Sequence, residues 1–183
     1  MHLSQLGKWQ HSLFLLLALV VLLIHFQFFH GGYLGYDDLE YMKLTAKLIK
    51  GEYQLDENLY TYRWAVVFPL ALAYSIFGIN DFSNVLIFIV PFLLICHLCL
   101  KLMAKFSAGA KLIAVLFVLF LPLHLVYVEK PMPDIWVELG FLLCFYGYYN
   151  TRFQVKSGHL PMMQFLLGAL VMFLSKESFL VIY

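Results

Sequence analysis

Residues 82–100 read FSNVLIFIVPFLLICHLCL, a run of 19 residues without Asp, Glu, Lys or Arg that lies between Asp81 and Lys101. An α-helix needs about 20 apolar residues to cross the roughly 30 Å of hydrocarbon in a bilayer, and this run has that length. Working outward from it, the chain has four further charge-free stretches, at residues 9–36, 64–80, 112–128 and 157–175. Their number predicts an all-α, polytopic helical membrane protein.

The composition of the 183 residues supports the same class. Apolar residues make up 63% of the chain and charged residues only 13%, whereas a soluble domain is about half apolar and a quarter charged. A soluble globular protein is therefore excluded. The net charge is +1, and no basic cluster with interleaved aromatic residues suggests a nucleic-acid partner.

The predicted elements follow the charge-free stretches. The first stretch has no small-residue cleavage site after its apolar core, so we interpret it as an uncleaved signal anchor. No Gly-x-x-x-Gly pair falls within an apolar segment, so nothing points to a dedicated helix-dimer face. Because the chain stops inside an apolar run at Tyr183, we expect residues 1–183 to be a single membrane domain, the N-terminal part of a longer enzyme. Membrane helices are expected at residues 12–29, 82–100, 112–128, 135–149 and from 161 onward.

Segment 64–79 is predicted to enter the membrane and to leave it on the same side. Its helical part, Trp64 to Phe77, has 14 residues, which corresponds to a helix of about 21 Å. Pro69 interrupts this part, and Gly78 begins a group of turn-forming residues. The segment is therefore too short and too broken for a regular crossing.

The distribution of Lys and Arg favours the same topology. If segment 64–79 crossed the membrane, most cations of the later loops would lie outside, against the positive-inside bias. If it turns back, and loop 30–63 is set aside as outer in either case, six cations lie inside and only Lys130 lies outside. The first outer loop, about 30–63, and the second, about 129–134, then share one surface. The six inner cations are Lys8, Lys101, Lys105, Lys111, Arg152 and Lys156.

The first outer loop contains the sequence DDLEYMKLTAKLIK at residues 37–50. Charged residues recur at helical spacing on one side, so an amphipathic interfacial helix lying in the headgroup plane is predicted. Asp37 and Glu40 have the D-x-x-E form of a capping box, in which Asp37 serves only to cap the helix. Capping needs one carboxylate, however, and the pair Asp37-Asp38 also suits a general base just above the hydrocarbon. Both alternatives remain open.

A second candidate group follows the second outer loop. Asp134 and Glu138 are one turn apart, so both carboxylates lie on one face of the helix that begins there. An ionisable group inside a membrane helix is costly and indicates function. The structural alternative is that Asp134 caps the helix and that Glu138 pairs with Lys130.

Arg63 is a candidate phosphate-binding residue at the outer boundary, because a guanidinium matches phosphate geometry. Its structural alternative is an interfacial position among Tyr60, Tyr62 and Trp64. Lys176 would add a second cation at the same surface. Four histidines without ligand spacing are interpreted as packing or boundary residues: His25, His30, His97 and His124.

The chain resembles the N-terminal part of the GT-C fold glycosyltransferases in the order of four short motifs. The resemblance is closest to the branch that contains the protein O-mannosyltransferases and the lipid A aminoarabinose transferases. Many members carry Asp-Glu where this chain has Asp37-Asp38. The motifs are GYDDLEYMKLTA (35–46), YRW-x4-PLALAYSIFG (62–78), PD (133–134) and LSKE (174–177).

The resemblance implies a membrane glycosyltransferase that moves a sugar from a polyprenyl-phosphate carrier to a lipid, glycan or protein acceptor. Its location would be the bacterial inner membrane, with the active face outward. Some relatives use a divalent cation and others do not, so the metal stays open, as does the oligomeric state. The implied catalytic residues are Asp37, Asp38 and Asp134. With Glu138 from the loop analysis, the expected substrate-binding residues are Arg63, Tyr41, Glu138 and Lys176.

The alternative function is that of a non-enzymatic polytopic membrane protein, such as a transporter fragment or a scaffold. A transporter predicts paired polar groups near the bilayer midplane and broken helices in matching halves. The candidate carboxylates of this chain are instead expected near one boundary. That distribution favours surface chemistry on a lipid-linked substrate.

Overall fold

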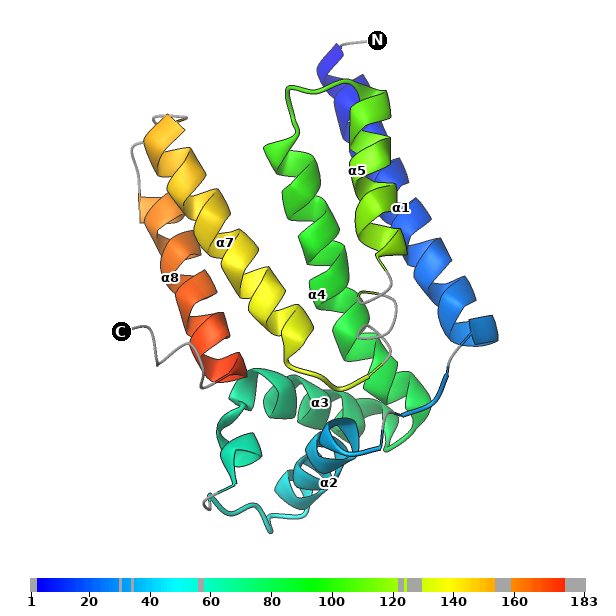
Figure 1. Cartoon of the computed structure of the whole chain (residues 1–183), viewed down its shortest axis with the longest axis vertical. Coiled ribbons are helices and arrows are strands. Elements are labelled where there is room, and N and C mark those ends of the chain that lie inside the picture. Colours follow the sequence, from blue (N-terminus) through cyan, green and yellow to red (C-terminus); the bar gives the residue numbers. More distant parts are fainter. Residues whose placement is uncertain are drawn as a thin grey trace.

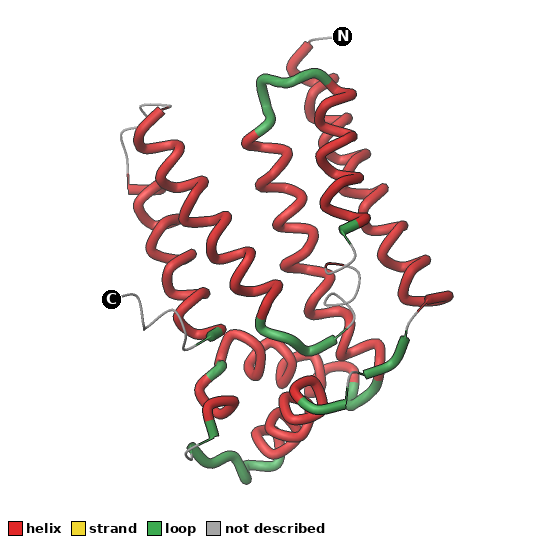
Figure 2. Tube along the Cα trace, viewed as in Figure 1, coloured by secondary structure: helices red, strands yellow, loops and turns green. Residues whose placement is uncertain are grey.

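The computed structural model describes residues 3–29, 31–33, 35–55, 58–121, 124, 130–153 and 159–176. The regular elements within these ranges are all helical, with seven α-helices and one short 3-10 helix (Figure 2). The predicted all-α class is confirmed for this part of the chain. In chain order the elements are α1 (Leu3–Phe29), α2 (Asp37–Ile49), η1 (Leu59–Tyr62), α3 (Trp64–Phe77), α4 (Asp81–Leu102), α5 (Ala108–Phe120), α7 (Asp134–Phe153) and α8 (His159–Ser175).

Five of these helices stand side by side as a bundle, and α2 and α3 lie across one end of it (Figure 1). Helices α1, α5 and α8 run toward this end, whereas α4 and α7 run away from it. We call it the α2–α3 end, and we call the end at which the N-terminus lies the opposite end. Helix α4 is the centre of the packing, since it contacts α1, α3, α5 and α7.

The core around α4 is apolar. Phe88, Phe92 and Ile95 of α4 are fully buried, and Ala18 and Leu22 of α1 are buried in the same cluster. Burial of apolar side chains on this scale is the main force that holds the helices together. The outside of the bundle is apolar as well.

Within the described part of the chain, two helices are long and apolar enough to cross a membrane: residues Trp9–Phe29 of α1, and α4. Three other apolar helices, α3, α5 and α8, are shorter. Large apolar side chains point away from the core on several helices, which is uncommon on the surface of a soluble monomer. Examples with at least half of their area exposed are Leu16, Phe28, Phe68, Leu72, Ile113, Phe117, Phe141, Leu166 and Leu170.

Helix α3 has the bounds predicted from the sequence, Trp64 to Phe77. Pro69 lies inside it, and Gly78 ends it with a φ of 78°, a conformation that glycine adopts without steric strain. Asn80 then caps α4 by accepting a hydrogen bond from the Ser83 backbone N–H at 2.9 Å. As a result, α3 begins and ends at the α2–α3 end (Figure 1).

The two ends of the bundle differ in charge. The opposite end carries Lys101, Lys105, Lys111 and Arg152, which lie at the ends of α4, α5 and α7 or between them. None of the Asp and Glu residues that the structure describes lies at that end. Lys156, which was counted with these cations, is outside the described residues.

Helices α7 and α8 pack closely against each other through glycines. A Cβ atom added to Gly140 would lie 2.7 Å from the Gly168 carbonyl oxygen, and one added to Gly147 would lie 2.6 Å from the Pro161 carbonyl oxygen. Gly140 and Gly147 are seven residues apart and therefore share a helix face. This pair of helices thus approaches closely through glycines at a wider spacing than that of Gly-x-x-x-Gly.

Some helix bounds differ from the predicted ones. Helix α1 begins at Leu3 rather than at residue 12. Helix α5 spans Ala108–Phe120 rather than residues 112–128, and Ser107 caps it by accepting a hydrogen bond from the Ala110 N–H at 3.3 Å. The prediction began each helix at the edge of a charge-free run, but a helix begins at its cap, and Lys111 fits within its first turns.

The amphipathic helix predicted at 37–50 is observed as α2. Its buried residues include Tyr41, Leu44 and Thr45, and the helix contacts α3. The apolar side of α2 is therefore used, at least in part, within the protein.

A group of polar side chains fastens the segment before α2 to α3 and α4. The Tyr33 hydroxyl donates to the Asp81 carboxylate and accepts from Asn84 Nδ2 at 2.5 Å. The Tyr74 hydroxyl of α3 donates to Asn84 Oδ1 at 2.5 Å. Burial, together with the hydrogen bond to Asp81, raises the pKa of Tyr33 to about 12.

Candidate functional site

Asp37 is the first residue of α2, and its carboxylate turns toward η1. Its Oδ1 accepts a hydrogen bond from the Tyr60 hydroxyl at 2.7 Å. The residue at the N-cap position is Tyr36 rather than Asp37, and the side chain of Tyr36 makes no capping hydrogen bond. The capping-box alternative for Asp37 is therefore wrong, and Glu40 lies 3.5 Å from Lys43 Nζ in the next turn.

Asp38 holds the turn that leads into α2. This side chain is fully buried, and its Oδ1 accepts from the backbone N–H groups of Gly35 at 3.0 Å and Leu39 at 2.9 Å. Gly35 has a φ of 105°, which side chains rarely allow. Of the two adjacent carboxylates, Asp38 thus has the structural task and Asp37 is the more accessible one.

Arg63 follows η1 and precedes α3, and its guanidinium lies against two tyrosine rings. It donates a hydrogen bond to the Tyr41 hydroxyl, and its Cζ lies 4.8 Å from the centre of the Tyr60 ring. Both contacts stabilise the cation in one orientation. Asp37, Tyr41, Tyr60 and Arg63 form one connected group, which we call the Asp37 cluster.

The electrostatics of the Asp37 cluster keep its phenols neutral. The hydrogen bond to Asp37 raises the pKa of Tyr60 to about 12. Burial raises the pKa of Tyr41 further, although the neighbouring Arg63 opposes this. Sequence reasoning had assigned Tyr60 only to an aromatic belt, and its role as a link between Asp37 and Arg63 depends on how η1 folds against α2.

Asp134 and Lys176 meet at the α2–α3 end as well. Asp134 begins α7, Lys176 directly follows α8, and Lys176 Nζ lies 3.5 Å from Asp134 Oδ1. Both side chains are partly exposed. The close packing of α7 on α8 brings the start of one helix to the end of the other. Lys176 was expected near this surface, but its pairing with Asp134 was not predicted.

Glu138 is paired with His124 and not with Lys130, the partner that the structural alternative names. Its Oε2 lies 2.7 Å from His124 Nε2, and His124 Nδ1 lies 2.8 Å from the Val118 carbonyl oxygen. His124 had been interpreted as a packing or boundary residue. It shares no sequence motif with Glu138, so the pattern of residues contains no signal for this pair.

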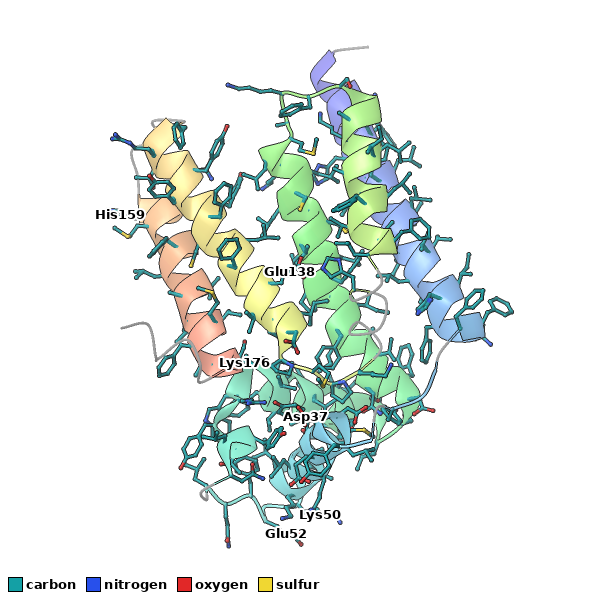
Figure 3. The ribbon with its side chains drawn as sticks, in the orientation of Figure 1. Asp37, Lys50, Glu52, Glu138, His159 and Lys176 are labelled. Atoms are coloured by element: carbon teal, nitrogen blue, oxygen red, sulfur yellow. The ribbon has the colours of Figure 1, made fainter. Side chains whose placement is uncertain are left out.

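Figure 3 shows how these side chains are distributed. Asp37 and Lys176 lie near the α2–α3 end, and Glu138 lies farther along the bundle. Helix α3 connects the Asp37 cluster with the pair of Asp134 and Lys176, because it starts directly after Arg63 and contacts α8. The structure thus brings four of the candidate residues to one end of the bundle: Asp37, Arg63, Asp134 and Lys176. Glu138 lies farther from that end. Glu129 of the second outer loop is outside the described residues.

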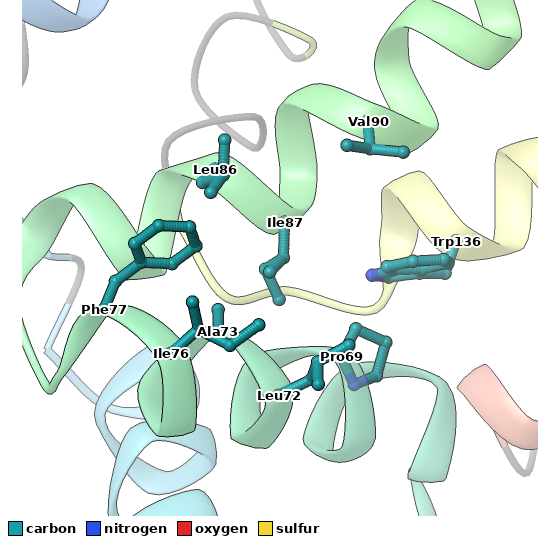
Figure 4. A pocket seen from close by; sticks show the side chains of 9 residues that line it. All are labelled: Pro69, Leu72, Ala73, Ile76, Phe77, Leu86, Ile87, Val90 and Trp136. Carbon is teal, nitrogen blue, oxygen red and sulfur yellow. The ribbon is translucent and has the colours of Figure 1, made fainter.

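An apolar groove opens beside these groups, between α3, α4 and α7 (Figure 4). Its volume is about 280 Å³. Trp136, two residues after Asp134, forms one wall, and its indole N–H is buried without a hydrogen-bond partner. The other residues that line the apolar groove are Pro69, Leu72, Ala73, Ile76, Phe77, Leu86, Ile87 and Val90.

The described residues contain no group of three or more His, Cys, Asp or Glu side chains that could hold a metal ion. Nearer the opposite end, His11 Nε2 of α1 lies 2.8 Å from His97 Nδ1 of α4. His97 thus contributes to a contact between helices.

Comparisons with known protein families, curated protein sequences and solved structures find no match to this chain.

Proposed function

We propose that the protein is an integral membrane glycosyltransferase that moves a sugar from a polyprenyl-phosphate carrier to an acceptor outside the membrane. The apolar exterior of the bundle supports residence in a bilayer. The two long apolar helices, α1 and α4, are the first candidates for spans, and α5, α7 and α8 complete the bundle. On this proposal the protein is polytopic, and α3 lies at the membrane surface.

One observation carries the proposal: Tyr60 holds both a carboxylate and a cation at one end of the bundle, because its hydroxyl donates to Asp37 and its ring centre lies 4.8 Å from Arg63 Cζ. The pair Asp134 and Lys176 lies at the same end. A base and several cations at one surface suit the transfer of a phosphate-linked group. Asp38 and Tyr41 are buried and hold Asp37 and Arg63 in position.

In the proposed reaction, the acceptor hydroxyl gives its proton to the Asp37 carboxylate as its oxygen bonds to the anomeric carbon of the sugar. The bond between this carbon and the phosphate oxygen breaks, and its electron pair leaves with the polyprenyl phosphate. Arg63 and Lys176 stabilise the negative charge that accumulates on the leaving phosphate. Attack from the side opposite the phosphate inverts the anomeric centre.

The apolar groove suits the carrier of such a donor. It is lined by apolar side chains of three helices, and it lies beside α7, which begins at Asp134. An isoprenoid chain in the groove would remove both its own surface and that of the groove from water and from the headgroups. Its phosphate would then lie near the cations of the α2–α3 end.

The charges at the two ends support an orientation. Cytoplasmic loops carry an excess of Lys and Arg, and the opposite end carries cations without any described carboxylate. On this basis the opposite end is cytoplasmic and the α2–α3 end is outer. In a bacterium this corresponds to the inner membrane.

The test is the release of polyprenyl phosphate from radiolabelled polyprenyl-phosphate hexoses and pentoses by membranes that contain the protein. We expect Asp37→Asn to reduce release by roughly 10²–10⁴-fold, the range for loss of a general base. Glu52→Gln is the matched control, because Glu52 is an exposed carboxylate just after the same helix. Full release by the Asp37→Asn variant would contradict the proposed base.

A non-enzymatic scaffold or a transporter fragment predicts a different result. Neither would release polyprenyl phosphate from any of these donors. The variants Asp37→Asn, Arg63→Ala and Asp134→Asn would then give the same result as the wild type, with no release of polyprenyl phosphate.

A further inference from the structure

A second cavity lies beside the Asp37 cluster, and its chemistry differs from that of the apolar groove. Its volume is about 470 Å³, and polar surface predominates in its lining. We call it the polar pocket. Its lining residues come from the start of α2 and from η1 and the residue before it: Gly35, Tyr36, Leu39, Glu40, Asn58 and Tyr60.

We propose that the polar pocket binds a pyranose ring of the acceptor, so that the acceptor is a glycan rather than a protein hydroxyl. This inference rests on the proposed function and names the substrate class of the same site. The side chains present suit the two kinds of surface on a sugar. Tyr36 and Tyr60 offer aromatic rings for its C–H faces, and the Glu40 carboxylate accepts hydrogen bonds from hydroxyl groups.

The exposure of these side chains fits a site that a ligand would cover. Tyr36 is 80% exposed, whereas tyrosine side chains are intermediate in burial on average. The side chain of Glu40 is 27% exposed and is therefore reachable from the pocket.

The charge of the polar pocket selects against anionic ligands. Among the residues that the structure describes, its lining includes one carboxylate, Glu40, and no Lys or Arg. Lys43 Nζ lies 3.5 Å from Glu40 Oε2, and the Arg63 guanidinium lies against the ring of Tyr60. A phosphate or a carboxylated sugar would face an unfavourable carboxylate, whereas a neutral or amino sugar would not. The pocket therefore suits the acceptor and not the phosphate of the donor.

The location of the polar pocket relates it to the proposed chemistry. Tyr60 lines the pocket and donates its hydroxyl hydrogen to Asp37 at 2.7 Å. Tyr60 thus belongs both to the polar pocket and to the Asp37 cluster. The apolar groove is lined by α3, α4 and α7 instead, so the carrier chain and the acceptor ring occupy different cavities.

The test is saturation-transfer NMR on the full chain in nanodiscs, with methyl pyranosides of mannose, glucose, N-acetylglucosamine and 4-amino-arabinose as probes. We expect binding of at least one neutral or amino sugar and no binding of glucose 6-phosphate. The variants Tyr36→Ala and Glu40→Gln should each weaken binding by about tenfold, the loss expected for one good contact. Tyr62→Ala and Glu52→Gln change exposed residues outside the pocket and should leave binding unchanged.

The outcomes separate this inference from the proposed function. Asp37→Asn should retain sugar binding while losing transfer, which supports both. Binding by the wild type without any release of polyprenyl phosphate supports the pocket and overturns the transferase. Release of polyprenyl phosphate with unchanged binding in Tyr36→Ala and Glu40→Gln, or with no binding of any probe, overturns the pocket and leaves the transferase standing.

Discussion

The phenol of Tyr60 joins two residues that sequence reasoning treats separately. Its hydroxyl donates to Asp37, and its ring lies beside the Arg63 guanidinium. The sequence context of Tyr60, next to Tyr62 and Trp64, indicates only a membrane boundary. Asp37 and Tyr60 are 23 residues apart, and no local pattern predicts that they meet.

The tyrosines near the α2–α3 end predict a loss of stability in alkali. The pKa values of Tyr33 and Tyr60 are raised to about 12, whereas an unfolded chain loses phenol protons near pH 10. Between these values the unfolded state binds fewer protons than the folded state, so the free energy of unfolding falls as the pH rises from about 10 to about 12. Unfolding in detergent, followed by circular dichroism from about pH 9 to about pH 11.5, measures this fall.

The same measurement on Asp37→Asn isolates the contribution of Tyr60. Without the carboxylate, the pKa of Tyr60 should return toward its ordinary value, because the hydrogen bond to Asp37 is the largest cause of its rise. The alkaline fall in stability should therefore be shallower in this variant than in Glu52→Gln. An identical pH dependence in the two variants would refute the assigned cause.

At the scale of elements, the packing of α7 on α8 decides where Asp134 and Lys176 lie. A Cβ atom on Gly168 would be 2.4 Å from the Gly140 carbonyl oxygen and 2.7 Å from the Cys144 N. These contacts involve backbone atoms, which cannot rotate away as a flexible side chain does. The close approach of the two helices thus depends on the absence of a Cβ atom at these glycines.

Gly168→Ala should therefore destabilise the protein. Overpacking of a close contact typically costs about 1–3 kcal/mol, and this should exceed the gain of about 0.5–1 kcal/mol from replacing a glycine inside a helix. Reversible unfolding in mixed detergent measures the difference in free energy.

Gly109→Ala in α5 is the matched control, because a Cβ atom at Gly109 meets nothing within 4 Å. This variant should be as stable as the wild type or more stable. Equal stability of Gly168→Ala and Gly109→Ala would show that α7 and α8 do not pack as described.

At the scale of the whole molecule, α3 ends at the same end of the bundle at which it starts. This decides which loops share one membrane surface. Lys50 and Ile79 flank the segment that contains η1 and α3, and Lys105 lies between α4 and α5 at the opposite end. All three residues are exposed. They report on the two ends without touching the Asp37 cluster.

Single cysteines at these three positions, in a protein without Cys96, Cys99 and Cys144, test the topology. We expect a membrane-impermeant thiol reagent on intact cells to label Lys50→Cys and Ile79→Cys but not Lys105→Cys. Each result follows from the short α3 and from the cationic opposite end.

Other labelling patterns have distinct meanings. Labelling of only one of positions 50 and 79 would mean that α3 crosses the membrane, and the proposed site would then be divided between two surfaces. Labelling of position 105 alone would keep α3 at one surface but reverse the proposed orientation.

Several features follow from the sequence without the tertiary structure. The charge-free runs predict most of the helices, and Gly78 with the short run before it predicts the bounds of α3. These signals are local, because hydropathy and turn preference act over a few residues and one or two helical turns. The prediction that Asp37, Arg63 and Asp134 lie at one end rests on the same local signals, since it needs only the number of crossings.

The partners of the charged side chains depend on the tertiary structure alone. Asp37 bonds to Tyr60, Asp134 to Lys176, and Glu138 to His124 rather than to Lys130. Each pair joins separate segments of the chain, and its distance depends on how closely the helices approach and how they are rotated. Those quantities come from the packing of whole helix faces, such as the glycines of α7 against α8, and short-range sequence patterns do not determine them.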